Sequence, residues 1–123
     1  MSEALLRKTW RKAVFAVWGD ACILCGARPV SPHHVVKRRN NILKWDVQNG
    51  RPLCVDCHDE VERNVVKIPL TDYLRDLNKW DVKSWIAHVN QISPPYTKEM
   101  FYRDELEELQ TAIKNPKVYR SGK

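Results

Sequence analysis

Apolar residues recur at helical spacing near the start of the chain and again in its second half, but not in between. The apolar positions of residues 3–18 are Leu6, Trp10, Ala13, Val14 and Val17. This spacing predicts an amphipathic helix that ends at Gly19 and Asp20. The opposite face carries Arg7, Lys8, Arg11 and Lys12. We interpret it as a solvated surface in preference to a DNA-contacting one.

The helical pattern resumes at Cys54 or Val55, runs past residue 65 and stops before Pro69. Three further helices are expected because a capping residue precedes each apolar repeat. These capping residues are Thr71, Asp81 and Thr97. The tail from Pro116 onward is expected to be frayed.

Residues 21–53 have no helical period and are rich in glycine, proline and asparagine. Short β-prone pieces lie around Val30, Val35–Val36 and Trp45–Val47. We expect a knuckle followed by an irregular two-stranded hairpin with a long connecting loop. The chain is therefore a mainly helical α+β protein. Its expected segments are an N-terminal helix (1–20), a central core (21–68) and a helical C-terminal extension (69–123).

All four cysteines fall into two pairs, Cys22-x-x-Cys25 and Cys54-x-x-Cys57. The N-terminus has neither a signal-peptide nor a transit-sequence pattern, and no apolar run is long enough to span a membrane. We therefore expect a cytoplasmic protein with no membrane partner. Metal thiolates are more common than disulfides in that compartment, so the pairs predict a structural Zn²⁺ site. The alternative, a thioredoxin-like redox pair, leaves the second pair unexplained.

Positive charge is concentrated in the first part of the chain. The formal net charge is +6, which is the sum of +7 for residues 1–53 and −1 for residues 54–123. Such a distribution favours a polyanionic partner, although many basic proteins bind no nucleic acid.

Three of the four histidines lie close to the cysteine pairs. His33 and His34 stand in the loop between the pairs, and His58 directly follows Cys57. In a strand, His33 and His34 point to opposite sides. A pair of neutral imidazoles, His33 and His58, suits a divalent cation, and His34 beside them suits a general base.

These residues resemble the HNH endonucleases, the ββα-metal (His-Me finger) nucleases, in their four-cysteine zinc-binding form. The matching stretch runs from Cys22 to about Glu62. It contains Cys22-x-x-Cys25, His33-His34-Val35-Val36, Asp46-Val47-Gln48-Asn49-Gly50-Arg51-Pro52-Leu53-Cys54 and Cys57-His58. The resemblance implies a zinc-stapled ββα nuclease core over residues 21–68.

The resemblance also implies a role for each matching residue. His34 is the general base that activates water, Asn49 holds the loop that orients it, and the four cysteines bind the structural zinc. His33 and His58 hold a catalytic divalent ion, expected to be Mg²⁺ or Mn²⁺. Many members have Asp where this chain has His33, so Ni²⁺ or Zn²⁺ is also possible there. Glu62, four residues after His58, is a candidate third ligand.

The expected function is hydrolysis of DNA phosphodiester bonds, giving 5′-phosphate and 3′-hydroxyl products as the family does. Basic residues in and after the histidine loop are predicted to contact phosphates. They are Lys37, Arg38, Arg39, Lys44 and Arg51. The resemblance implies a phage or mobile-element origin and action in the cytoplasm of a bacterial or phage-infected cell. For the C-terminal helices three roles stay open: binding DNA, forming a homodimer or docking onto a phage or mobile-element protein.

Two other classes of protein would share parts of this pattern. A non-catalytic zinc-stabilised module that binds DNA or RNA explains the cysteines and the charge, but not Asn49 together with three clustered histidines. A structural or interaction protein that kept the zinc core after losing activity is the second alternative.

Overall fold

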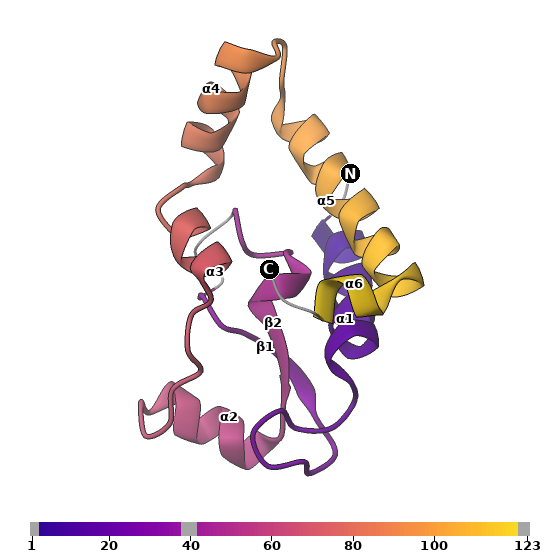
Figure 1. Cartoon of the computed structure of the whole chain (residues 1–123), viewed down its shortest axis with the longest axis vertical. Helices are drawn as coiled ribbons and strands as arrows, with labels where there is room; N and C mark the ends of the chain where they lie inside the picture. The colour runs from indigo at the N-terminus through magenta and orange to yellow at the C-terminus, as the bar shows by residue number, and fades with distance from the viewer. Residues whose placement is uncertain (1–2, 38–41, 121–123) are drawn as a thin grey trace.

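The computed structural model describes residues 3–37 and 42–120, and in this part of the chain helices surround one short hairpin (Figure 1). The helices are α1 (Glu3–Trp18), α2 (Val55–Glu62), α3 (Asp72–Leu77), α4 (Val82–Ile92), α5 (Lys98–Lys114) and α6 (Pro116–Arg120). The antiparallel strands are β1 (Ser31–His34) and β2 (Gly50–Leu53), and the 3-10 turn η1 (Val47–Asn49) directly precedes β2. The predicted α+β, mainly helical class is confirmed. None of the described helices is long and apolar enough to cross a membrane.

Helix boundaries agree with the capping residues read from the sequence. The side chains of Thr71, Asp81 and Thr97 each accept a hydrogen bond from the backbone N–H three residues further on, at the starts of α3, α4 and α5. Such a bond satisfies one of the N–H groups that a helix start leaves without a partner. At the end of α1, Gly19 adopts a φ of +90°, a left-handed conformation that glycine reaches without steric cost.

The hairpin lies elsewhere than its β-prone residues predict. Val35–Val36 and Trp45–Val47 are outside the ladder, which instead pairs Ser31–His34 with Gly50–Leu53. Directly after β1, the Val35 N–H donates a 2.9 Å hydrogen bond to the Asn49 carbonyl in η1 instead of to a strand. Tertiary hydrogen bonds thus override β-propensity at these positions.

Two helices also differ from expectation. Helix α2 ends at Glu62, before Val65, because the chain turns at Asn64 with a φ of 60°. The tail from Pro116 onward, expected to be frayed, forms helix α6 up to Arg120. Tyr119 is buried there, and its carbonyl accepts a 2.9 Å hydrogen bond from Gln48 Nε2. These contacts with η1 hold a segment that its own sequence does not mark as a stable helix.

The N-terminal and C-terminal segments share one hydrophobic core. Helix α1 packs against α5 and α6, which lie beside it on the right of Figure 1. The buried members of this core are Leu6, Trp10, Ala13, Val14, Val17, Trp45, Val47, Leu109, Ala112 and Tyr119. A second cluster joins α3, α4 and α5 to the end of the long loop through Leu43, Leu74 and Phe101. The three segments read from the sequence therefore pack as one unit.

Helix α1 also lies directly against the hairpin. Trp10 is 2% exposed, and its indole N–H donates a 2.9 Å hydrogen bond to the Asp46 carbonyl. A Cβ at Gly50 would lie 2.3 Å from Val14 Cγ2 and 2.9 Å from Trp10 Cζ2. Glycine is therefore the residue that lets β2 approach the helix this closely.

Replacement of Gly50 by alanine should separate β2 from α1. Because the new methyl group meets packed side chains, we expect Gly50→Ala to lower the free energy of unfolding by about 1–3 kcal/mol. Urea denaturation followed by tryptophan fluorescence would measure the loss. Ser31→Ala, at an exposed position of β1, should change it by less than about 0.5 kcal/mol. Equal stability of both variants would contradict the close approach.

Candidate functional site

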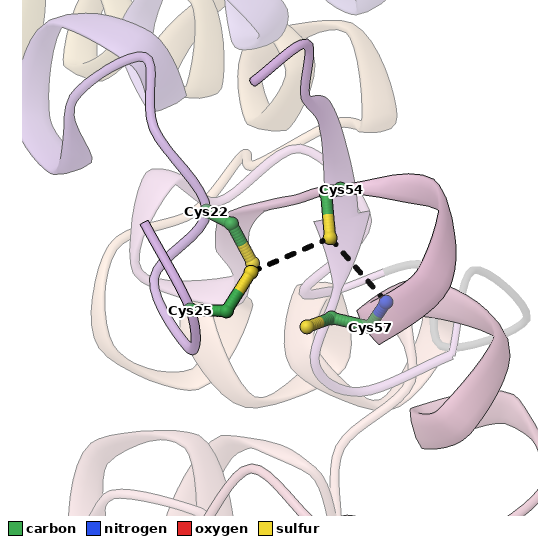
Figure 2. A group of neighbouring side chains, drawn as sticks. All are labelled: Cys22, Cys25, Cys54 and Cys57. Carbon is green, nitrogen blue, oxygen red and sulfur yellow. Dashed lines mark hydrogen bonds between the residues drawn. The ribbon is translucent and has the colours of Figure 1, made fainter. Parts of the chain in front are cut away.

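Two cysteine pairs that are far apart in the sequence come together beside the hairpin (Figure 2). Their sulfur atoms all lie within 4.8 Å of one another, and those of Cys25 and Cys54 are 3.6 Å apart. Sulfur atoms about 2.3 Å from a tetrahedral zinc ion lie about 3.8 Å from each other. None of the four forms a disulfide. The cluster is thus compatible with a structural metal such as zinc, as predicted.

Local turns present the thiols of each pair on one side. In the first pair, the Cys22 N–H bonds to the Ala27 carbonyl at 2.9 Å, and Gly26 closes the turn with a φ of 79°. In the second, Cys54 caps α2, and the Cys57 N–H points at its sulfur at 3.4 Å. The local backbone therefore holds the two thiols of each pair close together.

The electrostatics of the cluster favour a cation. Burial acts to raise the pKa of Cys22, but hydrogen bonds from the backbone amides of Cys54, Cys25 and Leu24 bring it to about 6. Contacts with the sulfurs of Cys25 and Cys54 raise the pKa of Cys57 instead. Adjacent thiolates repel each other, so all four ionise together when a metal ion offsets their charge.

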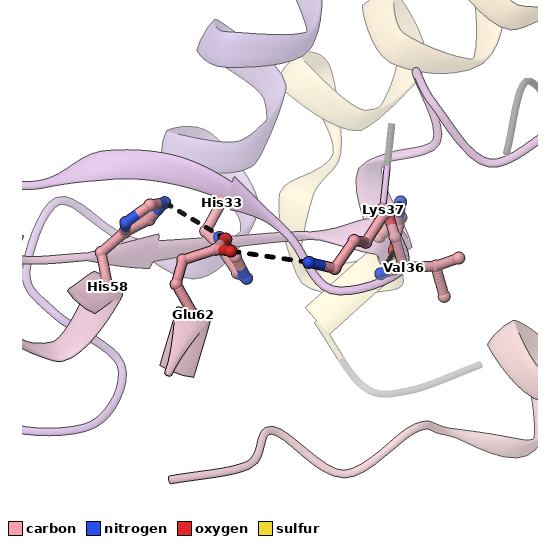
Figure 3. Close-up of polar contacts among 6 residues, drawn as sticks. His33, Val36, Lys37, His58 and Glu62 are labelled. Atoms are coloured by element: carbon pink, nitrogen blue, oxygen red, sulfur yellow. Dashed lines mark hydrogen bonds and ion pairs between the residues drawn. The ribbon is translucent and has the colours of Figure 1, made fainter. Parts of the chain in front are cut away.

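A second group of metal-ligating side chains joins β1 to α2 (Figure 3). His33 Nδ1 and His58 Nε2 each lie 3.8 Å from Glu62 Oε1. This separation is too long for a hydrogen bond. Ligand atoms that are each about 2.1 Å from one ion, however, lie up to about 4.2 Å apart. The predicted candidate Glu62 therefore stands with His33 and His58 where a single cation could touch all three.

His33 is the buried member of this group, with 8% of its surface exposed. Burial lowers its pKa, and the neighbouring charge of His58 lowers it further, against the opposing effect of Glu62. Its imidazole is accordingly neutral at neutral pH, which is the form that ligates a metal. His58 and Glu62 lie on the exposed side of α2, one helical turn apart.

His34 faces the other way, toward α1. Its ring stacks on Trp10 with centroids 4.2 Å apart and planes inclined by 12°. Its Nε2 lies 2.8 Å from the Lys44 carbonyl oxygen. A carbonyl can only accept, so Nε2 carries the proton, and the neutral ring has its lone pair on Nδ1. Stacking and hydrogen bond together fix both the tautomer and the orientation of this imidazole.

Asn49 is fully buried and braces the long loop between the strands. Its Oδ1 accepts a 2.6 Å hydrogen bond from the Val36 N–H. Its Nδ2 donates to the carbonyls of Val36 at 2.9 Å and Leu43 at 3.1 Å. Because both ends of the loop are tied to one side chain, Lys44 and its carbonyl are held beside His34. A catalytic contribution of Asn49 stays a prediction.

One cleft of about 370 Å³ brings the two histidine environments together. Its lining is Arg7, Trp10, Arg11, Pro32, His33, His34, Lys37, Trp45, His58 and Glu62. Three cations therefore surround the imidazoles. Arg7 and Arg11 are missed by the sequence analysis, which assigns their helix face to solvent. The sequence shows their positions close to Trp10 in the helical repeat, but it does not show that α1 packs over the hairpin.

The predicted phosphate contacts divide into different environments. Lys37 is exposed at the cleft, with its Nζ 3.6 Å from Glu62 Oε2. Lys44 is mostly covered: its Nζ lies 3.2 Å from Glu3 Oε1 and 5.1 Å from the centre of the Trp45 ring. Arg38 and Arg39 lie outside the described residues.

Arg51, also predicted to contact phosphate, is buried and does not line the cleft. Its guanidinium donates to the carbonyls of Gln48 and Gly50 at 2.8 and 2.7 Å and lies 3.8 Å over the Trp18 ring. Burial lowers the pKa of Arg51 to about 10. The side chain therefore holds η1, β2 and α1 together, and its predicted phosphate contact stays a prediction.

We expect native mass spectrometry of the purified protein to find one tightly held zinc ion per chain. Cys22→Ser should lose this ion and unfold at lower temperature, because the site fixes the loop and α2 to each other. His58→Ala is the matched control, since His58 belongs to the other ligand group, and it should keep the zinc. Zinc-free wild-type protein would refute the assignment of the cysteines.

The chain matches no protein-family model, no curated protein and no solved structure in three comparisons with known proteins. The likeness to HNH endonucleases therefore rests on the spacing of the cysteines, the histidines and Asn49, and it stays a prediction.

Proposed function

We propose that the protein is a metal-dependent DNA endonuclease of the HNH type, with His34 as general base and His33, His58 and Glu62 as ligands of a divalent cation. The observation that carries the proposal is the shared cleft. It brings a three-residue ligand group, a separately oriented imidazole and three cationic side chains to one surface. The order β1, β2, α2 with His33 and His34 on the first strand and His58 on the helix agrees with a ββα-metal core.

His34 is suited to take a proton from water. Donation of its Nε2–H to the Lys44 carbonyl leaves Nδ1 as the basic atom of the neutral ring. The stacked Trp10 keeps the ring from rotating, so the base is oriented before substrate binds. Histidine is the side chain most often used as a general base near neutral pH.

The ligand group supplies the complementary charge. His33 and His58 are neutral donors and Glu62 is an anionic one, a set that accepts Mn²⁺, Ni²⁺ or Zn²⁺ as well as Mg²⁺. A cation bound there would stabilise negative charge that develops on the phosphate and the leaving oxygen. The cysteine cluster stands apart and has a structural task, since it ties the loop after α1 to the start of α2.

The cellular setting follows from the resemblance alone. We propose DNA as the partner and the cytoplasm of a bacterial or phage-infected cell as the place of action. Helices α5 and α6 pack on α1, and α4 contacts α5. We propose that the exposed surface of these C-terminal helices binds DNA, a second copy or a phage protein.

Removal of the general base should abolish most of the activity. In a supercoiled-plasmid nicking assay with Mg²⁺, Mn²⁺ or Ni²⁺, we expect His34→Ala to cleave at least about a hundredfold more slowly than wild type. His88→Ala, on α4 beside Trp80 and Trp85, should cleave normally. The mechanism is wrong if wild type cleaves in no metal or if His34→Ala is unimpaired. DNA binding without cleavage would favour the non-catalytic zinc module.

Glu62 should act through metal affinity. Glu62→Gln keeps the shape of the side chain but removes its charge, so we expect a higher Mn²⁺ concentration for half-maximal nicking, with most of the rate recovered at saturation. Asp59→Asn is the matched control, because it removes one charge from the same helix at a residue that pairs with Arg63 and is not part of the ligand group. An unchanged Mn²⁺ dependence in Glu62→Gln would remove this residue from the ligand set.

A further inference from the structure

We infer that Arg7 and Arg11 of α1 form a phosphate-binding pair that holds the polynucleotide backbone over the histidine cleft. The inference rests on the proposed function, and it assigns a substrate contact to a helix outside the ββα core. Both arginines line the cleft together with His33, His34 and His58. Both are exposed to solvent, so their guanidinium groups are accessible to a ligand.

These two arginines lack the partners that engage other basic residues nearby. Arg28 pairs with Asp20, Lys37 with Glu62, and Lys44 with Glu3. Within the part of the chain that the structure describes, the guanidinium groups of Arg7 and Arg11 form no hydrogen bond or ion pair. They lie four residues apart on one helix, where two like charges repel each other. An anion bound between them would relieve that repulsion.

Their position is fixed relative to the proposed base. Trp10 lies three residues after Arg7 and directly before Arg11, and it is anchored by its hydrogen bond to the Asp46 carbonyl and by its stacking on His34. Helical spacing puts Arg7 and Arg11 beside Trp10, separated from each other by about 6 Å along the helix axis. Two guanidiniums in such a row present planar forks of N–H donors, which match successive phosphate groups of one strand.

Other ligands fit this row less well. The arginines border an open cleft with a cation-binding ligand group at its side, where a lone carboxylate substrate would use one guanidinium and leave the other unengaged. A polyanion whose charges repeat along a chain uses both. Because these contacts reach phosphates and not base edges, they add affinity without sequence preference.

The chain provides a matched control on the same helix. Lys8 and Lys12 are also exposed and also four residues apart. All four basic residues border a hollow on α1 beside Ala4 and Phe15, but only Arg7 and Arg11 also border the histidine cleft. The double variants Arg7→Gln/Arg11→Gln and Lys8→Gln/Lys12→Gln remove the same net charge from equally exposed positions. General electrostatic attraction would weaken equally in both, whereas a specific phosphate contact would distinguish them.

The first experiment measures DNA binding under conditions in which the DNA is not cleaved. Fluorescence anisotropy of a short labelled DNA duplex with Ca²⁺ as the cation, over about 50–200 mM salt, gives the affinity and the slope of log K against log salt. For the arginine variant we expect about tenfold or greater loss of affinity and a slope reduced by about 2, one for each phosphate contact. For the lysine variant we expect a slope within about 0.5 of wild type. Equal losses in both variants, or an unchanged slope in the arginine variant, would overturn the assignment.

Kinetics then separate this inference from the proposed function. In Mn²⁺, the arginine variant should show a raised KM for plasmid with a smaller change in kcat, and the Mn²⁺ concentration for half-maximal nicking should stay as in wild type. Nicking with an unchanged KM would reject the arginine contact and leave the nuclease standing. Arginine-dependent binding by a wild type that never nicks would reject the nuclease but support the contact.

Discussion

Trp10 is the side chain through which most of the molecule is connected. Its indole N–H ties α1 to the long loop at the Asp46 carbonyl, its ring stacks on His34, and Gly50 lies beneath it without a side chain. Burial of so large an aromatic group in the core shared by α1, α5 and α6 gives the helix a single position over the hairpin. The orientation of His34 and the place of the α1 arginines both follow from that position.

The two candidate ligand groups differ in their donor atoms and in their exposure to solvent. The cysteines lie at local turns of the backbone, and two of them, Cys22 and Cys54, are buried. The second group is half open: His33 is buried, whereas His58 and Glu62 face solvent beside the cleft. A closed site with four protein ligands suits folding, and a site with fewer ligands and an open side leaves room for substrate.

Burial also decides what each positive charge can do. Arg51 lies under Trp18 and donates its hydrogen bonds to the backbone of η1 and β2, so it stabilises the hairpin. Arg7 and Arg11 have the same chemical group but no such partners in the described structure, and they face the cleft. The same kind of residue thus serves packing at one position and is accessible to a ligand at another, according to what surrounds it.

The sequence by itself determined the features that depend on neighbours along the chain. Capping residues and apolar periodicity located α1, α3, α4 and α5, and the Cys-x-x-Cys spacing predicted the sulfur cluster, because a turn fixes each pair locally. The tertiary structure alone decided the burial of Arg51 and the docking of α6 through Tyr119. It also decided that Arg7 and Arg11 line the same cleft as the histidines. Each of these requires α1 and the hairpin to meet, and contacts between segments so far apart in the chain leave no periodic signal in either segment.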